Sequence, residues 1–218
     1  MQVLVAGAHG PTGQHTVRLL AERGHDVRAM VHRESYAGEV EALGDRVEAV
    51  VADLTEPETL ADAVRGCDAV VFAAGSNGED VWGVDRDGAN ALVDEAEDAG
   101  ADRFVMLSAM NADAPEDSPE ALREYLRAKA EADAYLRESD LTWTVVRPGA
   151  LSDDEGTERV SVGDDLDREG DVPREDVAAT MVTALELEAT HGATFELLSG
   201  DEPVEAALRG LAGGDSES

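Results

Sequence analysis

The sequence has little cysteine, few aromatic residues and no long apolar run. Its single cysteine, Cys67, excludes an intrachain disulfide. No run of about 18 or more apolar residues is present, so the pattern gives no transmembrane helix. Because the first expected strand begins at Gln2, the sequence leaves no room for a signal peptide, and we expect a cytoplasmic protein.

Basic residues are also scarce. The chain has 17 Lys and Arg against 49 Asp and Glu, a formal net charge of −32, and only one of the 17 is a lysine, Lys129. The acids are spread along the chain, which favours adaptation to high salt, as in a halophile, over an acidic interaction protein. In either case nucleic acid and anionic membranes are poor partners, and we expect neither.

Short β-branched runs alternate with helical stretches along the 218 residues. Several of the strands are near-continuous apolar runs, as parallel strands buried on both faces are. The alternation predicts an α/β fold, a single domain built on a Rossmann-type, doubly wound parallel sheet. Strands are expected at residues 2–6, 26–31, 47–51, 69–73, 103–108, 142–147 and 194–198, and helices at 11–23, 37–43, 57–65, 82–99, 119–139 and 173–187.

One stretch, residues 152–171, breaks this alternation. It is rich in Asp, Glu and Gly and contains one small possible strand at 159–162. It can be a solvated loop, or a flap over a substrate site, because it follows a strand at the carboxyl edge of the sheet. The sequence leaves both interpretations open.

A glycine-rich turn follows the first strand. Gly7, Gly10 and Gly13 form G-x-x-G-x-x-G, and the expected helix starts at Pro11. This chemistry requires glycine for the tight turn, for close approach of the backbone to a pyrophosphate, and for packing of the helix on the strand. The helix N-terminus adds free N–H groups and the positive end of its dipole. The residues expected to bind a dinucleotide here are Gly7, His9, Gly10, Pro11, Thr12 and Gly13.

The end of the second strand bears on the choice of dinucleotide. NAD-binding sites usually place an acid there for the ribose hydroxyls, but this strand ends in Arg33. A guanidinium suits a 2′-phosphate, which it can bind with two N–H groups. The alternative is a solvent-facing Arg33 paired with one of the many carboxylates. We therefore expect NADP(H), with NAD(H) as the less favoured cofactor.

Three further strand ends fit a cofactor groove. Small residues after the fourth strand would let a cofactor pass close to the backbone, and the turns after the third and sixth strands would lie near the adenine and the nicotinamide. These residues are Asp53, Leu54, Ala73, Ala74, Gly75 and Pro148.

Tyr125 and Lys129 form Y-x-x-x-K within a long expected helix, and a spacing of four residues puts both side chains on one face. A phenol beside an ammonium ionises more readily, so it can exchange a proton with a carbonyl or an alcohol during hydride transfer. Lysine suits this position because it is a compact charge that can also reach ribose hydroxyls. The alternative is an ordinary exposed helix lysine.

Taken together and in order, these motifs resemble the atypical short-chain dehydrogenase/reductases, the NAD(P)-binding, sugar-epimerase-like group. The resemblance covers roughly residues 1–200. It rests on G-A-H-G-P-T-G at 7–13, V-H-R at 31–33, A-D-L at 52–54, F-A-A-G at 72–75, V-D-R-D-G-A-N at 84–90, Tyr125 with Lys129, and T-W-T-V-V-R-P-G-A-L at 142–151. It implies a bound NAD(P), and a catalytic Ser108 that orients a substrate oxygen near Tyr125.

Two departures matter for the function that the resemblance implies. Larger epimerases carry a substantial C-terminal substrate domain, and only a small one fits after residue 150; many atypical members keep the cofactor site without catalysis. We expect an NAD(P)-binding Rossmann domain at 1–211, with a small substrate-side region at 151–211, and an acidic tail at 212–218.

The favoured function is an NADP(H)-dependent oxidoreductase acting on a small carbonyl or alcohol, with Ser108, Tyr125 and Lys129 as catalytic residues. A non-catalytic NADPH-binding redox sensor and a nucleotide-sugar epimerase-like enzyme stay open as alternatives. The expected partner is a small-molecule substrate, no metal site is expected, and the oligomeric state is left open.

Overall fold

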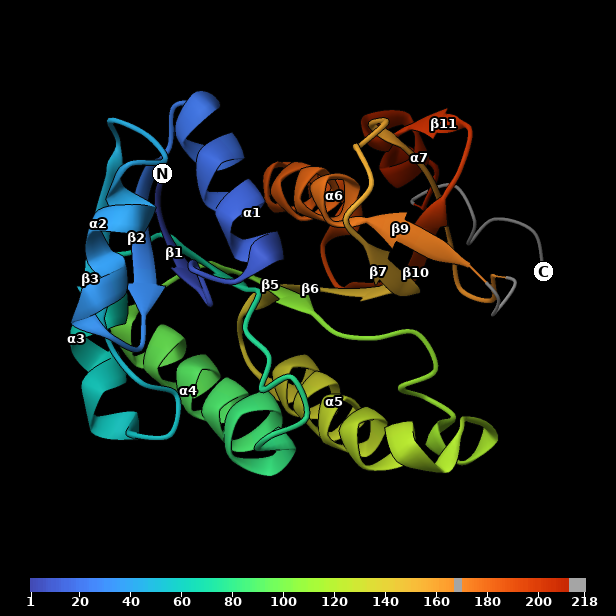
Figure 1. Ribbon diagram of the computed structural model, residues 1–218, viewed down its shortest axis with the longest axis horizontal. Helices are drawn as coiled ribbons and strands as arrows, with labels where there is room; N and C mark the ends of the chain where they lie inside the picture. The colour runs from blue at the N-terminus through green and yellow to red at the C-terminus, as the bar shows by residue number, and fades with distance from the viewer. Residues whose placement is uncertain (167–169, 212–218) are drawn as a thin grey trace.

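A computed structural model of the protein describes residues 1–166 and 170–211. These residues form a nine-stranded sheet with the strand order β11-β8-β10-β6-β5-β4-β1-β2-β3 (Figure 1). The seven strands from β10 to β3 are parallel, and β8 and β11 are antiparallel additions at one edge. The bounds are β1 Gln2–Ala6, β2 Asp26–Val31, β3 Val47–Val51, β4 Ala69–Phe72, β5 Arg103–Leu107, β6 Thr142–Pro148, β8 Arg159–Gly163, β10 Ala193–Ser199 and β11 Glu202–Pro203.

Helices cover both faces of this sheet. One face carries α1 (Pro11–Glu22), α2 (Ala37–Glu41), α6 (Arg174–Glu186) and α7 (Val204–Leu211), and the other carries α3 (Leu60–Val64), α4 (Ala89–Ala99) and α5 (Glu120–Glu138) (Figure 1). The doubly wound α/β prediction is therefore confirmed, and each of the seven expected strands is found to within one residue at either end. Single 3₁₀ turns lie at Glu34–Tyr36, Pro57–Thr59, Pro115–Asp117 and Glu188–Thr190.

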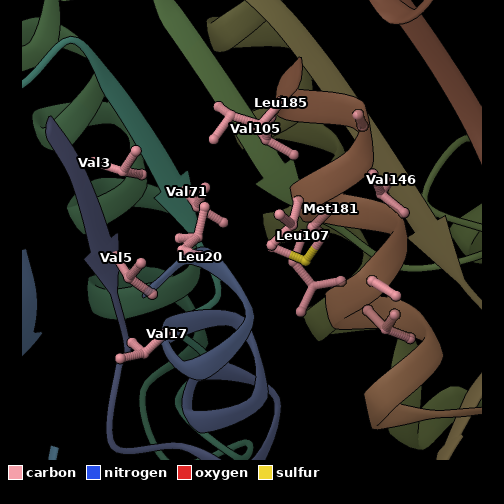
Figure 2. Packing of buried hydrophobic residues seen from close by; sticks show 14 of the residues in the cluster. Val3, Val5, Val17, Leu20, Val71, Val105, Leu107, Val146, Met181 and Leu185 are labelled. Atoms are coloured by element: carbon pink, nitrogen blue, oxygen red, sulfur yellow. The ribbon is translucent and has the colours of Figure 1, made fainter. Parts of the chain in front are cut away.

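Alternation along the strands divides the core into two clusters. In β1, Val3 and Val5 belong to one cluster, whereas Leu4 belongs to the other. Figure 2 shows the first cluster, in which Leu20 of α1 and Met181 of α6 point at the valines of the strands. Burying each such side chain contributes about 1.5–3 kcal/mol, so the parallel sheet is held from both sides.

The helix expected at residues 82–99 is α-helical only in its second half. Residues Val81–Gly88 form a π-helical turn, η3, and the α-helix α4 begins only at Ala89. The Asp80 carboxylate accepts a hydrogen bond of 2.9 Å from Gly83 N and so caps this turn. Gly88 packs against Leu54, where a Cβ on residue 88 would come within 2.6 Å of the Leu54 Cβ. The cap from Asp80 is local and the contact with Leu54 is tertiary, and helical periodicity reveals neither.

The stretch 152–171 is more ordered than a solvated loop. Before and after it, β7 (Ala150–Ser152) and β9 (Asp171–Pro173) pair as a separate two-stranded parallel sheet. Within it, β8 joins the main sheet, and the buried Asp176 carboxylate accepts hydrogen bonds from Thr157 N (2.9 Å) and Glu158 N (2.7 Å). Residues 167–169 and the expected tail at 212–218 lie outside the described residues.

No helix in the described ranges is both long enough and apolar enough to cross a membrane.

Candidate functional site

The glycine turn brings three elements together. Gly7 has φ +82°, and a Cβ on it would lie 2.6 Å from the Cα of Ala74, which follows β4. A Cβ on Gly13 would lie 2.1 Å from the Gly7 carbonyl oxygen, which also accepts a 3.0 Å hydrogen bond from Gly10 N. Only glycine fits these positions, because any side chain would collide with backbone. The turn therefore holds β1, α1 and the end of β4 in close contact.

The N-terminus of α1 has no acidic or capping side chain. Gly10 is its N-cap, Pro11 occupies the first position, and no acid stands in the first turn. By contrast, the first turns of α2, α3, α5, α6 and α7 all contain an acid. In so acidic a chain this end of α1 keeps its positive dipole and N–H groups for an anion, which suits a pyrophosphate.

A cationic and aromatic cluster lies beside this turn, at the end of β2; we call His9, His32, Arg33 and Tyr36 the Tyr36 cluster. The His9 ring stacks on Tyr36 with centroids 3.7 Å apart, and His32 meets Tyr36 edge-on at 5.3 Å. The Arg33 guanidinium lies 6.0 Å from the Tyr36 ring centroid. Arg33 is exposed, and no ion pair links it to any carboxylate of the described residues, so the solvent ion pair that sequence left open is not observed there.

The other expected cofactor residues have diverse surroundings. Asp53 is half-buried, and its carboxylate accepts hydrogen bonds from Thr55 N and Oγ1, so it stabilises its own turn. Leu54 is buried under Gly88. The residues Ala73, Ala74 and Gly75 are half-buried or exposed after β4, and Pro148 is buried at the end of β6.

Lys129 is a buried lysine, not an exposed helix lysine. Only 2% of it is accessible, and its Nζ donates a 3.1 Å hydrogen bond to the Leu107 carbonyl oxygen. Its counter-ion is Asp85 of η3, whose Oδ1 lies 3.3 Å away. The ammonium also lies 5.8 Å from the Tyr125 ring centroid. The expected Tyr125–Lys129 pair is thus brought together, with an additional carboxylate.

Asp85 is a candidate site residue that the sequence indicated only as part of the motif at 84–90, without a role. It is fully buried, and its Oδ2 accepts hydrogen bonds from Ser76 N (3.1 Å) and Ser76 Oγ (2.6 Å). It therefore connects Lys129 to the loop that follows Gly75. The single lysine was the available signal, because a buried ammonium in this helix needs a carboxylate partner.

Tyr125 and Ser108 differ in how their hydroxyls are used. Tyr125 is half-buried, and its hydroxyl makes no hydrogen bond within the described ranges. Ser108 is buried, and its hydroxyl donates to Asp133 Oδ2 at 2.9 Å. Ser108 thus has a carboxylate partner that the sequence did not predict, and the expected role toward a substrate oxygen stays a prediction.

Asp133 carries a second buried ion pair at this edge. Arg147 of β6 lies 3.0 Å from its Oδ2, and Asp133 Oδ1 is buried without a hydrogen-bond partner. Burial raises the pKa of Asp133, while the Arg147 charge and the Ser108 hydrogen bond act in the opposite direction. The carboxyl ends of β4, β5 and β6 therefore hold two buried ion pairs side by side on η3, α5 and β6.

Comparisons with known proteins agree with this geometry. A family model described as NAD(P)H-binding matches residues 7–188. The Bacillus subtilis protein named "uncharacterized sugar epimerase YhfK" is 42% identical over 217 residues, which is 97% of this chain and 100% of that protein. A solved structure from Bacillus halodurans, named as an NAD-dependent epimerase/dehydratase, superposes with a TM-score of 0.91 at 36% identity and covers 96% of this chain and 99% of its own. Sanguinarine reductase of Eschscholzia californica is 27% identical over 96% of this chain and 93% of that protein.

Proposed function

The chain belongs to the NAD(P)H-binding family, and on that premise we propose that it is an NADP(H)-dependent oxidoreductase that acts on a small carbonyl or alcohol. One observation carries the proposal of turnover. The Tyr125 hydroxyl has no hydrogen bond within the described residues, and the Tyr125 ring centroid lies 5.8 Å from the buried ammonium of Lys129, at the carboxyl edge where the glycine turn also lies. A phenol and an ammonium in this relation suit proton exchange with a substrate oxygen.

The residues at this edge fit a dinucleotide. The backbone of the glycine turn and the N-terminus of α1 would hold the pyrophosphate, because no acidic or capping side chain occupies the N–H groups at this helix end. Arg33 would hold the 2′-phosphate, and the small residues after β4 would leave room for the passing cofactor. When bound, the cofactor supplies the hydride.

The chain's own groups would supply proton transfer and positioning. Tyr125 would give a proton to a carbonyl oxygen or take one from an alcohol, and Lys129 would stabilise the tyrosinate and bind ribose hydroxyls. Asp85 would fix the direction of the ammonium but also offset part of its charge. Ser108 would position an alcohol substrate by accepting a hydrogen bond from its hydroxyl, because the Ser108 proton is donated to Asp133; a carbonyl oxygen would need that proton turned toward it instead.

A second candidate is a non-catalytic NADPH sensor. The observation that favours it is the occupation of the expected catalytic groups, since Lys129 is bonded to Asp85 and Leu107 and Ser108 is bonded to Asp133. The relatives named for an epimerase and a reductase suggest turnover, so the sensor is the lesser candidate.

The preference for NADPH over NADH should depend on Arg33. Losing a charge-assisted bidentate contact costs on the order of 1.5–3 kcal/mol, so Arg33→Ala should weaken NADPH binding by roughly 10- to 100-fold and change NADH binding little. Calorimetric titration of both cofactors in molar KCl measures this. An Arg33→Ala variant that keeps the wild-type ratio of the two dissociation constants would contradict the assignment.

Turnover should depend on the Tyr125 hydroxyl. Tyr125→Phe keeps the ring, so cofactor affinity should stay the same while turnover falls by roughly 10²–10⁴. Tyr135→Phe on the same helix removes a hydroxyl that binds only Asp94 and is the matched control. The assay follows NADPH absorbance against aldehydes, ketones and quinones. Tight NADPH binding without turnover of any of them would favour the sensor.

A further inference from the structure

We infer that Glu39 determines cofactor specificity: its carboxylate contacts His9 and competes with the 2′-phosphate of NADP(H) for the Tyr36 cluster. The ligand class is a phosphate monoester on a ribose. The inference rests on the proposed NADP(H) preference and adds to it a competing carboxylate, a second phosphate-binding side chain in His9, and an aromatic support in Tyr36.

Tyr36 is the centre of the cluster. The His9 ring lies almost parallel to it, with an interplanar angle of 8°, and the His32 ring stands at 67° to it. The Arg33 guanidinium faces the same ring. These side chains come from three segments, the glycine turn, the end of β2 and the 3₁₀ turn before α2. One aromatic ring therefore gathers three nitrogen-bearing side chains where the adenine ribose of a dinucleotide would lie.

The cation of the cluster has no carboxylate partner. Arg33 makes no ion pair among the residues that the structure describes, a feature that it shares with some other arginines such as Arg103. In the same ranges, Glu39 is the carboxylate that contacts the cluster, with its Oε2 3.0 Å from His9 Nε2. Glu39 stands on α2, one turn after Tyr36, so this contact closes the cluster on its outer side.

The His9–Glu39 contact is weak enough to exchange. The two side chains are 31% and 67% exposed, and exposed pairs contribute about 0–1 kcal/mol. A phosphate monoester carries nearly two charges and three acceptor oxygens, so it binds imidazole and guanidinium donors more strongly than one carboxylate does. A 2′-phosphate would thus displace Glu39 from His9, and the nearby Glu39 charge would still oppose it.

Removing the Glu39 charge should therefore help NADPH selectively. Glu39→Gln should tighten NADPH binding by roughly 3- to 10-fold, the effect of one like-charge contact and one freed donor, and change NADH binding less than about twofold. The matched control is Glu34→Gln, which removes the same charge next to Arg33 from a side chain without a contact to the cluster. Calorimetry with NADPH and NADH at one fixed KCl concentration gives the ratio of dissociation constants for each variant.

Tyr36 supplies the independent arm of the test. Tyr36→Leu removes the ring on which His9 and Arg33 lie, and should weaken NADPH binding about fivefold more than NADH binding, since a cation over an aromatic ring contributes roughly 0.5–1 kcal/mol at exposed sites. Tyr36→Phe restores the ring and should restore the preference. Melting temperatures of both variants show whether α2 remains folded.

The outcomes separate this inference from the proposed function. The expected result is a gain in NADPH preference in Glu39→Gln that exceeds that in Glu34→Gln, together with a loss in Tyr36→Leu that Tyr36→Phe reverses. Equal ratios in the two glutamate variants would overturn the inference while leaving the Arg33 assignment intact. A wild-type protein that binds NADH as tightly as NADPH would overturn both.

Discussion

The sheet buries charged side chains at both of its edges, but it satisfies them in different ways. At the amino edge, Arg103 begins β5 and is only 6% exposed. Among the described residues no carboxylate pairs with it; it donates to the carbonyl oxygens of Thr142 and Ala184, each at 2.8 Å, and to the Thr190 hydroxyl at 3.2 Å. Burial lowers the pKa of Arg103 to about 10. The guanidinium thus joins β5, β6 and the C-terminus of α6 through neutral acceptors.

At the carboxyl edge, opposite charges are paired. Lys129 faces Asp85, and Arg147 faces Asp133, with serine hydroxyls donating to both carboxylates. Asp133 Oδ1 is buried without a hydrogen-bond partner in the described ranges, whereas Asp85 Oδ1 lies 3.3 Å from the Lys129 ammonium. Buried polar groups without a partner cost stability and cluster where proteins bind or react.

The two edges thus differ in how their buried charges are compensated. Neutral acceptors around Arg103 connect elements, although the Arg103 Nε is itself buried without a hydrogen-bond partner among the residues that the structure describes. The ion pairs of the carboxyl edge neutralise buried charge next to the glycine turn and keep lone pairs available. Substitutions at the two edges should therefore change different quantities, the free energy of unfolding at one and cofactor affinity at the other.

Arg103→Met should give the larger loss of stability. Several buried acceptors lose their donor together, at about 1–3 kcal/mol each, while release of the buried charge offsets part of the cost, so we expect a net loss of roughly 2–4 kcal/mol. NADPH affinity should stay within twofold of wild type. Denaturant unfolding and NADPH titration measure the two quantities. Arg46→Met, which removes an exposed pair with Asp26 at the same edge, is the control and should change stability by less than about 0.5 kcal/mol. A large fall in NADPH affinity in Arg103→Met would contradict the division.

Asp85→Asn should weaken NADPH binding more than it lowers the free energy of unfolding. It breaks the pair that directs the Lys129 ammonium and disturbs Ser76, so Lys129 should lose its charge-assisted contact with the ribose, about 1.5–3 kcal/mol, and NADPH binding should weaken by roughly 10- to 100-fold. The free energy of unfolding should fall by less than it does in Arg103→Met. The control is Asp94→Asn, which removes a carboxylate from the exposed face of α4 and should change neither NADPH affinity nor the free energy of unfolding. Loss of stability with unchanged NADPH affinity would make the carboxyl edge structural as well.

The parallel core of the fold could be predicted because its signals are local. The apolar run of β1, the glycine turn and the Pro11 start of α1 follow one another within one short segment, and each is a separate indication of the same structure. The strands β7 and β9 could not be predicted, since each has three residues and their pairing joins Ala150 to Asp171. Such short strands exist only through a partner distant in sequence.

The candidate site also has residues whose proximity could be predicted from the sequence and residues for which it could not. Tyr125 and Lys129 stand four residues apart on one helix, so their proximity follows from helical geometry. Asp133 stands one further turn along that face and could have been found by extending the same argument. Asp85 could not, because it comes from a π-helical turn whose geometry depends on tertiary contacts. The burial of Lys129 was missed for the same reason.

The smallest expected effect is a shift in the pKa of His191, which tests whether the unpaired charge of Arg103 acts on a neighbouring group. Burial first, and the Arg103 charge second, hold the pKa of His191 below its usual 6.5, while Glu188 acts the other way. The unfolded chain then takes up this proton first as pH falls, so His191 should reduce stability from its usual pKa down to its folded pKa, below which the loss is complete.

In Arg103→Gln, which keeps N–H donors but removes the charge, the pKa of His191 should rise toward 6.5 without reaching it, because burial remains. NMR titration of the imidazole signals measures this shift, with Arg46→Met as the variant that should leave the His191 titration unchanged. An unaltered titration in Arg103→Gln would mean that burial alone lowers the pKa, and that the amino edge screens its cation as completely as the carboxyl edge does.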